Sequence, residues 1–415
     1  MVRSISKLKG YDRVINCMPD KSISVRAVLF NAFAVGRATV KNLLLSDDVL
    51  SAIACARALG ASVELDGDTA VISGAPFGGA TLDCGNSGTT ARLLIGLLSG
   101  LNGKYTITGD ASLSSRPMRR VTEPLARMGA KLADTDGRLP IAITGSRLHG
   151  IDYDMPVASA QVKSALMLAA LNASSPVTVR EPAPTRDHSE NMLAAMGATV
   201  KRGDGTVTIE PSVLRSKDIT VPGDISSAAY PICLALAVSG GKCTVKNVGI
   251  NPTRTGLIDV LRDCGADIEF SNVTTDVEPS ADITVRHGKL RPFAIDGALV
   301  PRLIDEIPVL CALACFIDGV SVVRGAGELR VKETDRIATT VAALKALGAD
   351  AEATDDGMTI RGGKPLKFGE VDPKLDHRIA MSAAVAGAAG AGVTVLDADC
   401  ASVSYPNFYG EVIGD

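Results

Sequence analysis

Basic side chains recur just ahead of apolar, helix-like runs along this 415-residue chain. A helix N-terminus disfavours a cation by ~0.3–1 kcal/mol, because its free N–H groups carry partial positive charge. A bound anion reverses that preference, since the cations and the N–H groups then share one ligand. Five such places predict an anionic ligand rather than scattered surface cations; they hold Lys21 and Arg26, Arg116, Arg186, Lys332 and Arg336, and Arg378.

Three polar segments before apolar runs, the one at Arg116 and two others, predict helix starts. Arg116 precedes Pro117, a residue favoured at the first helical position, so a helix is predicted to begin there. In "GNSGTTAR" a helix is predicted to begin near Asn86, and the residues around Gly88 could donate hydrogen bonds to a phosphate. In "ASAQVKSALMLAAL", Ser159 and its neighbours could do the same. Either segment could instead be an ordinary helix cap.

Two carboxylates complete the candidate chemistry. Asp305 begins an otherwise apolar run, where the alternative interpretation is an N-cap. Glu333 stands between Lys332 and Thr334, and its alternative role is a favourable acid in a first helical turn. A carboxylate beside several cations stays ionised, yet it can exchange protons with a bound substrate. His377 is assigned only an orienting role, and no histidines show the spacing of a metal site.

Composition excludes several other functions. The net charge is −3, the pI is near 5.9 and aromatic residues make up 3% of the chain, so we expect neither nucleic-acid nor membrane binding. Nine cysteines without C-x-x-C spacing indicate reduced thiols in a cytoplasmic protein. We also find no signal peptide and no membrane span.

The elements that must position these residues follow from an internal repeat. A helix-like run and a short strand occur six times, and the strands align at Thr39, Thr106, Thr178, Thr244, Ser321 and Thr394. Five of them are followed by a second helix that ends in Gly-Ala, at Gly60, Gly129, Gly197, Gly265 and Gly348. Each of these glycines stands where a helix end requires a left-handed residue. Alternating strands and helices predict an α/β fold.

The repeats divide into two groups of three. Units that start near Asp20, Asn86 and Ser159 form one predicted domain, residues 14–223. Units that start near Asp224, Asp305 and Asp376 form the other, residues 224–415. We expect a ligand in the cleft between the two domains.

The motifs together resemble the enolpyruvyl transferase family, and in particular its shikimate-pathway branch. They are "PDKSISVRA", "GNSGTTARLL", "GDASLSSRPM", "ASAQVKSALMLAAL", "LRVKETDRI" and "DHRIAMS". They occur in the family order from Pro19 to Ser382, which is nearly the whole chain. The resemblance implies two similar domains, each of three βαβαββ repeats arranged as an inside-out α/β barrel. It also implies that residues 1–13 complete the C-terminal domain.

The resemblance implies transfer of the enolpyruvyl group of phosphoenolpyruvate to the 5-hydroxyl of shikimate 3-phosphate, with release of phosphate. No metal or organic cofactor is implied, and a monomer is expected. Asp305, Glu333 and Lys21 would move protons. The residues that would hold shikimate 3-phosphate are Lys21, Ser22, Arg26, Ser159, Ala160, Gln161, Arg186, Asp305 and Lys332. Those that would hold phosphoenolpyruvate are Lys21, Gly88, Arg116, Gln161, Arg336 and Arg378.

The chain departs from the family pattern at a few positions. Many relatives carry a lysine where Val403 stands, which implies one cation fewer around phosphoenolpyruvate. Ala160 stands where some relatives have a second serine, so only its backbone could contact phosphate. Gly88 has no side chain and leaves room for glyphosate, an inhibitor longer than phosphoenolpyruvate. We therefore predict that glyphosate inhibits the protein.

Two other functions fit parts of the pattern. A UDP-N-acetylglucosamine enolpyruvyl transferase would share the fold and the donor, but that relative usually carries a loop cysteine, and "DASLSSRPMRR" has none. A repeat-built clamp around nucleic acid would require a basic surface and stacking aromatic residues, which the composition argues against.

Overall fold

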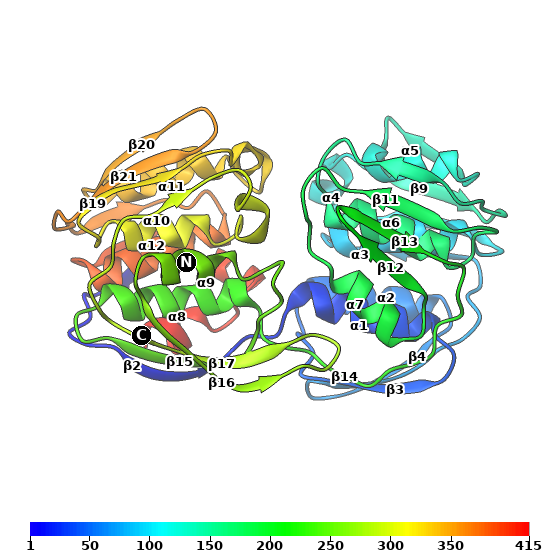
Figure 1. Ribbon diagram of the computed structural model, residues 1–415, viewed down its shortest axis with the longest axis horizontal. Helices are drawn as coiled ribbons and strands as arrows, with labels where there is room; N and C mark the ends of the chain where they lie inside the picture. The colour runs from blue at the N-terminus through cyan, green and yellow to red at the C-terminus, as the bar shows by residue number, and fades with distance from the viewer. Residues whose placement is uncertain (415) are drawn as a thin grey trace. The chain divides into compact units, whose positions relative to one another are not determined.

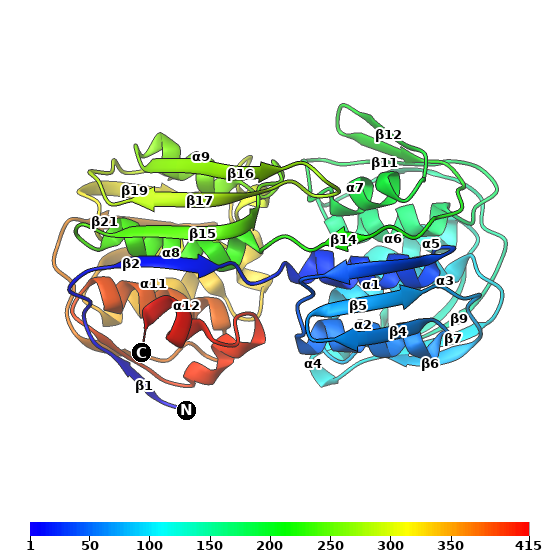
Figure 2. The same cartoon turned by 90° about the horizontal axis from the view of Figure 1, so that it is seen from below.

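The protein, described for residues 1–414 by a computed structural model, divides into two compact units (Figure 1). The N-terminal unit is Pro19–Val221, and the C-terminal unit joins Met1–Met18 to Pro222–Asp415. The first boundary lies a few residues beyond position 13, because β2 (Asp12–Asn16) pairs in parallel with β15 (Lys242–Gly249). Figure 2 shows these two strands side by side.

The N-terminal unit holds three four-stranded sheets built on one plan. In each sheet the first two strands are parallel and the later pairs are antiparallel. The first sheet is β14 (Ile219–Thr220), β3 (Arg37–Lys41), β5 (Thr69–Ser73) and β4 (Ser62–Asp66). The second is β6 (Ala80–Asp83), β7 (Lys104–Thr108), β9 (Arg138–Thr144) and β8 (Lys131–Thr135). The third is β10 (Asp152–Asp154), β11 (Val177–Arg180), β13 (Thr206–Ile209) and β12 (Val200–Gly203).

The C-terminal unit follows the same plan, with one sheet shortened to three strands. Its first sheet is β2, β15, β17 (Ser280–Arg286) and β16 (Asp267–Thr274). The second is β18 (Ala294–Ile295), β19 (Gly319–Val323), β21 (Met358–Gly362) and β20 (Asp350–Ala353). The third is β22 (Gly369–Val371), β23 (Val393–Val395) and β1 (Arg3–Ile5), in which β22 and β23 are parallel and β1 is antiparallel to β23. The six aligned hydroxyl residues therefore lie in six equivalent strands, one in each sheet.

Buried helices fill the inside of each unit, and the sheets and remaining helices surround them (Figures 1 and 2). In the N-terminal unit these helices are α1 (Lys21–Phe33), α3 (Gly88–Ser99) and α6 (Ala160–Ala170). In the C-terminal unit they are α8 (Ile225–Ala237), α10 (Ile307–Ala314) and α12 (His377–Ala389), which pack against one another. Most of their residues are buried, as expected of helices that are apolar on every side. The expected α/β fold of two three-repeat domains is confirmed.

Five outer helices end at the glycines of the Gly-Ala repeats. They are α2 (Asp47–Ala58), α5 (Arg119–Arg127), α7 (His188–Ala195), α9 (Gly256–Asp263) and α11 (Arg336–Ala346). All five glycines have positive φ, from +80° at Gly348 to +111° at Gly60. A residue with a Cβ rarely adopts this conformation, so the predicted helix ends are confirmed.

Polar caps place the starts of the inner helices. Asp20, Ser159, Asp224 and Asp376 each accept a backbone N–H in the first turn of the helix that follows. The two other predicted starts are displaced by one residue. Ser87 caps α3 in place of Asn86, and Glu306 occupies the N-cap position of α10 in place of Asp305.

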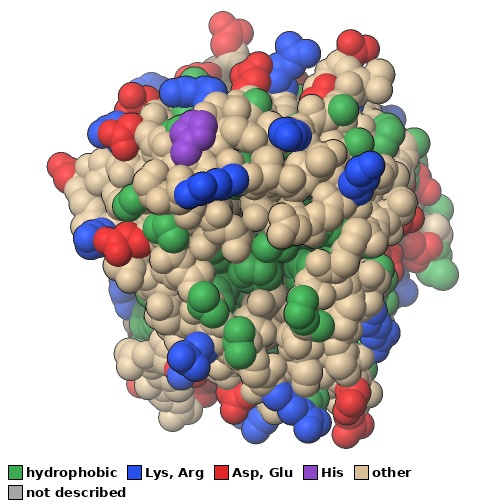
Figure 3. Space-filling model, turned by 90° about the vertical axis from the view of Figure 1, so that its right-hand side faces the viewer, with side chains coloured by type: hydrophobic (Ala, Val, Ile, Leu, Met, Phe, Trp, Pro, Cys, Tyr) green, Lys and Arg blue, Asp and Glu red, His purple; other side chains and the backbone are tan. Residues whose placement is uncertain are grey.

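No helix within residues 1–414 is long and apolar enough to cross a membrane. Figure 3 shows one face of the molecule. On that face Lys and Arg side chains are spread around the edge together with Asp and Glu, and hydrophobic side chains lie in a central hollow.

Candidate active site

Arg26 is the most buried cation of the N-terminal candidates. It lies on α1, one turn after Ser22, and is 3% exposed. Its Nε donates to the Ser189 hydroxyl at 2.8 Å, and its Nη2 donates to the Ser164 hydroxyl at 3.1 Å. These serines come from α7 and α6, so three helices fix one guanidinium. The guanidinium is thus held in a fixed position, and a guanidinium is a good partner for an anionic ligand.

Lys21 is the first residue of α1, and its ammonium group lies 3.0 Å from the Asp48 carboxylate on α2. At the start of α6, Ser159 is the N-cap and Ala160 the first helical residue. Arg186 is half-buried and precedes Asp187, the N-cap of α7. Each of the three starts therefore presents polar groups at a helix N-terminus, as the sequence predicts.

Gly88, Arg92 and Gln161 converge where α3 and α6 begin. Gln161 accepts from Nη1 of Arg92 at 2.6 Å and donates to the Thr89 hydroxyl at 3.1 Å. A Cβ added at Gly88 would lie 2.7 Å from Nη1 of Arg92 and 3.6 Å from Nη1 of Arg116. Gly88 therefore lies close to the guanidinium groups of Arg92 and Arg116.

Sequence reasoning missed Arg92. Burial, together with the positive charges of Arg116 and Arg120, lowers the pKa of Arg92 to about 10. Three like charges held together favour an anion among them. The signal was present in the sequence, because Arg92 follows Gly88 by four residues and so lies on the same face of the predicted helix.

The predicted helix start at Pro117 is wrong. A short helix, α4 (Ala111–Ser115), ends at Arg116 as its C-cap, and α5 begins only at Arg119. Nη2 of Arg116 donates to the Asn86 side-chain carbonyl at 2.7 Å, and the Asn86 amide donates to Asp110 at 2.7 Å. This chain of hydrogen bonds, rather than a helix N-terminus, holds Arg116 near Gly88.

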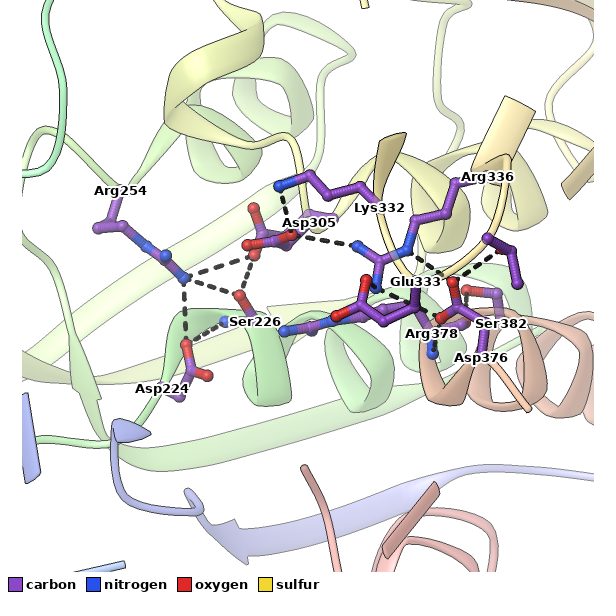
Figure 4. Close-up of polar contacts among 12 residues, drawn as sticks. Asp224, Ser226, Arg254, Asp305, Lys332, Glu333, Arg336, Asp376, Arg378 and Ser382 are labelled. Atoms are coloured by element: carbon purple, nitrogen blue, oxygen red, sulfur yellow. Dashed lines mark hydrogen bonds and ion pairs between the residues drawn. The ribbon is translucent and has the colours of Figure 1, made fainter. Parts of the chain in front are cut away.

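Arg336 is the centre of the polar cluster in the C-terminal unit (Figure 4). It is the first residue of α11, and its side chain is 1% exposed. Its Nε donates to Asp376 at 2.8 Å, its Nη1 to Asp305 at 3.2 Å and its Nη2 to Glu333 at 2.5 Å. One buried cation thus gathers both carboxylates that the sequence nominates for proton transfer.

Asp305 does not cap α10, so the capping interpretation is wrong. Its carboxylate lies on the N-terminal side of Glu306 and contacts Arg336, while the Lys332 ammonium lies 3.7 Å away. Lys332 ends the 3-10 helix η2 (Gly327–Val331) as its C-cap. Within the same charged run, Asp335 caps α11 and pairs with Arg330 at 2.5 Å.

The charges of this cluster shift the pKa values of Glu333, Asp376 and His377. Desolvation favours the neutral form of Glu333, but the Arg336 guanidinium holds the pKa of that carboxyl below its usual value. The pKa of Asp376 is lowered in the same way, again mainly by Arg336 against desolvation. Burial and the charges of Arg378 and Arg336 lower the pKa of His377 to about 3, so its imidazole is neutral at pH 7.

Arg378 differs from Arg336 because no carboxylate within residues 1–414 accepts a hydrogen bond from its side chain. The residue is buried on α12, and its Nη1 donates to the Tyr230 hydroxyl at 3.5 Å. Its Nε is buried and has no hydrogen-bond partner among residues 1–414. A buried donor without a partner is costly, and a ligand anion would satisfy it.

No group of three or more His, Cys, Asp or Glu side chains within the described residues is arranged to hold a metal ion. The candidate residues of the site carry guanidinium, ammonium and carboxylate groups. Such groups can bind anionic substrates and move protons.

Comparison with known proteins defines the family. The family model described as EPSP synthase (3-phosphoshikimate 1-carboxyvinyltransferase) matches residues 2–412. A 3-phosphoshikimate 1-carboxyvinyltransferase from Synechococcus sp. (strain WH7803) is 49% identical, and the alignment covers 98% of this chain and 95% of the relative. The same enzyme from Desulforudis audaxviator is 51% identical over 94% of this chain and 93% of the relative.

Solved structures agree with this result. An EPSP synthase from Acinetobacter baumannii superimposes with a TM-score of 0.90 at 39% identity, covering 98% of this chain and 96% of that one. The enolpyruvyl transferase NikO from Streptomyces tendae shares the fold, with a TM-score of 0.79 at 18% identity, covering 100% of this chain and 96% of that one. The chain belongs to the EPSP synthase (3-phosphoshikimate 1-carboxyvinyltransferase) family, and the enzyme class expected from its motifs is confirmed.

Proposed function

We propose that the protein transfers the enolpyruvyl group of phosphoenolpyruvate to the 5-hydroxyl of shikimate 3-phosphate and releases phosphate. This is a step of aromatic amino-acid biosynthesis. The family membership supports the reaction. The structural observation that carries it is the Arg336 guanidinium, which holds Asp305 at 3.2 Å and Glu333 at 2.5 Å. A base and an acid are thus kept beside one anion-binding group.

Both units contribute to the site in this proposal. Phosphoenolpyruvate carries a phosphate and a carboxylate, which require cations and N–H donors. Its proposed contacts are Lys21, Gly88, Arg116, Gln161, Arg336 and Arg378. The site also includes Arg92, because its Nη1 lies between Gly88 and Gln161.

Shikimate 3-phosphate has proposed contacts on α1, on α6, before α7 and in the C-terminal cluster. They are Lys21, Ser22, Arg26, Ser159, Ala160, Gln161, Arg186, Asp305 and Lys332. Arg26 supports this assignment, because the hydroxyls of Ser164 and Ser189 already hold its guanidinium in place without a ligand. Asp305 would then lie next to the 5-hydroxyl.

The reaction proceeds by addition and elimination. Asp305 accepts the proton of the 5-hydroxyl as that oxygen bonds to C2 of phosphoenolpyruvate, and C3 gains a proton through Glu333, with Lys21 as a second proton-transfer group. The tetrahedral intermediate then loses phosphate and one C3 proton, which restores the enol. A substrate anion on Arg336 weakens its hold on Glu333, and the pKa of Glu333 rises toward the value needed for proton transfer.

Two acceptors distinguish this function from its nearest alternative. We expect enolpyruvyl transfer to shikimate 3-phosphate and none to UDP-N-acetylglucosamine when each is supplied with phosphoenolpyruvate. Transfer to the nucleotide sugar alone would overturn the proposal. In D2O, the product should carry deuterium at C3, because the methyl group of the intermediate contains one proton from solvent.

We further infer a cytoplasmic monomer whose only partners are its small-molecule substrates and which binds no nucleic acid. All nine cysteines are free thiols and eight are buried, which suits a reducing compartment. The net charge of −3 gives no general attraction to nucleic acid. Light scattering of the purified protein tests the monomer, and a dimer mass would contradict it.

A further inference from the structure

Arg254 lies in a second buried cluster of the C-terminal unit, for which the proposed reaction has no role. It precedes Thr255, the N-cap of α9, and its side chain is 5% exposed. Its Nη2 donates to Asp224 at 3.1 Å and to the Ser226 hydroxyl at 2.7 Å, and lies 3.6 Å from Glu306. A buried cation is therefore held by two carboxylates and a hydroxyl (Figure 4).

Both acids stand at helix starts, but only the Asp224 carboxylate caps its helix. Asp224 caps α8 by accepting the Ser226 N–H at 2.9 Å. Glu306 occupies the N-cap position of α10, is 1% exposed and accepts the Ser226 hydroxyl. Ser226 thus joins both acids and the guanidinium, so the cluster forms one connected hydrogen-bonded unit.

Arg378 lies between this cluster and the Arg336 cluster (Figure 4). The charge of Arg378 is stabilised, against burial, by Tyr230 and by the nearby carboxylates of Asp305, Asp224 and Glu306. No described carboxylate accepts a hydrogen bond from the side chain of Arg378, and its Nε has no partner among residues 1–414. Asp224 instead accepts a hydrogen bond from Arg254, and Glu306 accepts one from Ser226 and lies 3.6 Å from Arg254.

We propose that Arg254 is a positioning residue for phosphoenolpyruvate binding: it engages Asp224 and Glu306, so that these acids leave the donors of Arg378 free for the substrate. The inference rests on the proposed function, because it takes Arg378 as a phosphoenolpyruvate contact. It adds a residue that never touches substrate but determines whether the substrate-binding arginine is available.

The physical reason is competition between acceptors. Without the Arg254 charge, the buried Glu306 and the partly buried Asp224 both lose a cationic partner, which is unfavourable. The nearest remaining cation is Arg378, whose buried Nε needs an acceptor. Bonding of either acid to Arg378 blocks the substrate anion, so binding of phosphoenolpyruvate weakens while the proton-transfer groups are unchanged.

The first experiment compares Arg254→Gln with Arg254→Lys in the full-length protein. We expect Arg254→Gln to raise KM for phosphoenolpyruvate by roughly tenfold or more, since a hydrogen bond to a charged group is at stake. KM for shikimate 3-phosphate and kcat should change much less. Arg254→Lys keeps the cation and should lie closer to the wild type. Equal effects of Arg254→Gln on both KM values would overturn the proposal, because they indicate general structural damage.

The second experiment is a charge rescue. Adding Glu306→Gln to Arg254→Gln removes one of the two competing acids, while its amide can still accept the Ser226 hydroxyl. We expect the double variant to recover most of the lost affinity for phosphoenolpyruvate. A double variant as weak as Arg254→Gln, or weaker, would overturn the proposal.

Arg286→Met is the matched control. Arg286 is an exposed arginine of the same unit, paired with Asp267 and Glu269 on β16, so the substitution removes the same charge far from any buried acid. It should leave both KM values as in the wild type. If Arg254→Gln does not fold, the Glu306→Gln variant tests the proposal by itself. Loss of this competing acid should leave KM for phosphoenolpyruvate unchanged or lower. A tenfold rise in that KM would overturn the proposal. An inactive wild-type protein would reject the proposed function instead.

Discussion

Nε of Arg336 donates to the Asp376 carboxylate at 2.8 Å, and both side chains are almost completely buried, at 1% and 0% exposure. Asp376 also caps α12 through the Arg378 N–H at 2.9 Å. One acid therefore fixes the direction of Arg336 and the start of the helix that carries Arg378. A single carboxylate thereby bonds the side chain of Arg336 and the backbone of Arg378, the two arginines of this unit that are assigned to phosphoenolpyruvate.

Asp376→Asn should destabilise the protein. Asn can still cap the helix, but Arg336 loses a buried anionic partner, and removing one partner of a buried pair costs ~3 kcal/mol in the free energy of unfolding. Urea unfolding measures the change. Asp372→Asn, at an exposed acid paired with Lys374, is the control and should change stability little. Equal stability of both variants would show that the Arg336–Asp376 pair does not hold the site together.

Glu333→Gln should separate turnover from binding. Gln can still accept from Arg336 but cannot deliver or remove the C3 proton, so kcat should fall by ~100-fold or more. Both KM values should stay within a few-fold of the wild type. The control is Glu328→Gln, an exposed acid of the same charged run. Near-normal turnover of Glu333→Gln would exclude Glu333 from proton transfer.

Gly88→Ala should reduce inhibition by glyphosate. The new Cβ would lie 2.7 Å from Nη1 of Arg92, so that guanidinium must move and the space for a longer inhibitor shrinks. We expect the inhibition constant to rise by ~10-fold or more, as for other overpacked sites, with turnover retained. Gly78→Ala is the control, since nothing lies within 4 Å of its added Cβ. Full activity of the unmodified protein in saturating glyphosate would contradict the predicted sensitivity.

His377 should make the protein less stable as the pH falls. Its pKa is about 3 in the folded state and 6.5 for an unperturbed side chain, so between these pH values the unfolded chain binds the extra proton. Stability therefore falls as pH decreases, by about 1.5 kcal/mol from pH 6.5 to pH 5 for this one group. In His377→Asn the fall over this range should be smaller by that amount.

The control for this pH effect is His149→Asn, at an exposed position. Chemical unfolding at the two pH values gives the free energy of unfolding of each variant and of the wild type. We expect His149→Asn to show the same fall in stability as the wild type. A His377→Asn variant with an unchanged pH dependence would show that the imidazole is not kept neutral by its surroundings.

The repeats made much of the fold predictable from sequence. Gly60 and Gly348 mark helix ends because few other residues adopt positive φ, and a local requirement of this kind is visible in one chain. The prediction of a helix start near Pro117 was wrong because contacts distant in sequence determine the structure there. Arg116 is held by Asn86 and Asp110, which lie 30 and 6 residues away, and no local rule contains such contacts.

The candidate site, like the fold, was predictable where the local sequence determines the structure and not where long-range contacts do. Cations ahead of apolar runs pointed to Arg26, Arg336 and Arg378, since each lies close to a helix start. Arg254 also precedes a helix start. Its role and that of Asp376 could not be found in this way, because they depend on which carboxylate faces which guanidinium in the folded unit. Charge partners across a core depend on tertiary structure, whereas helix ends depend mainly on neighbours in sequence.

Phosphate release from phosphoenolpyruvate, measured with and without shikimate 3-phosphate, tests the proposed function most directly. We expect no release without the acceptor. With it, one phosphate should appear for each molecule of product enolpyruvylated at the 5-hydroxyl, as seen by NMR. Phosphate release that does not depend on shikimate 3-phosphate, or no release in its presence, would contradict the assignment.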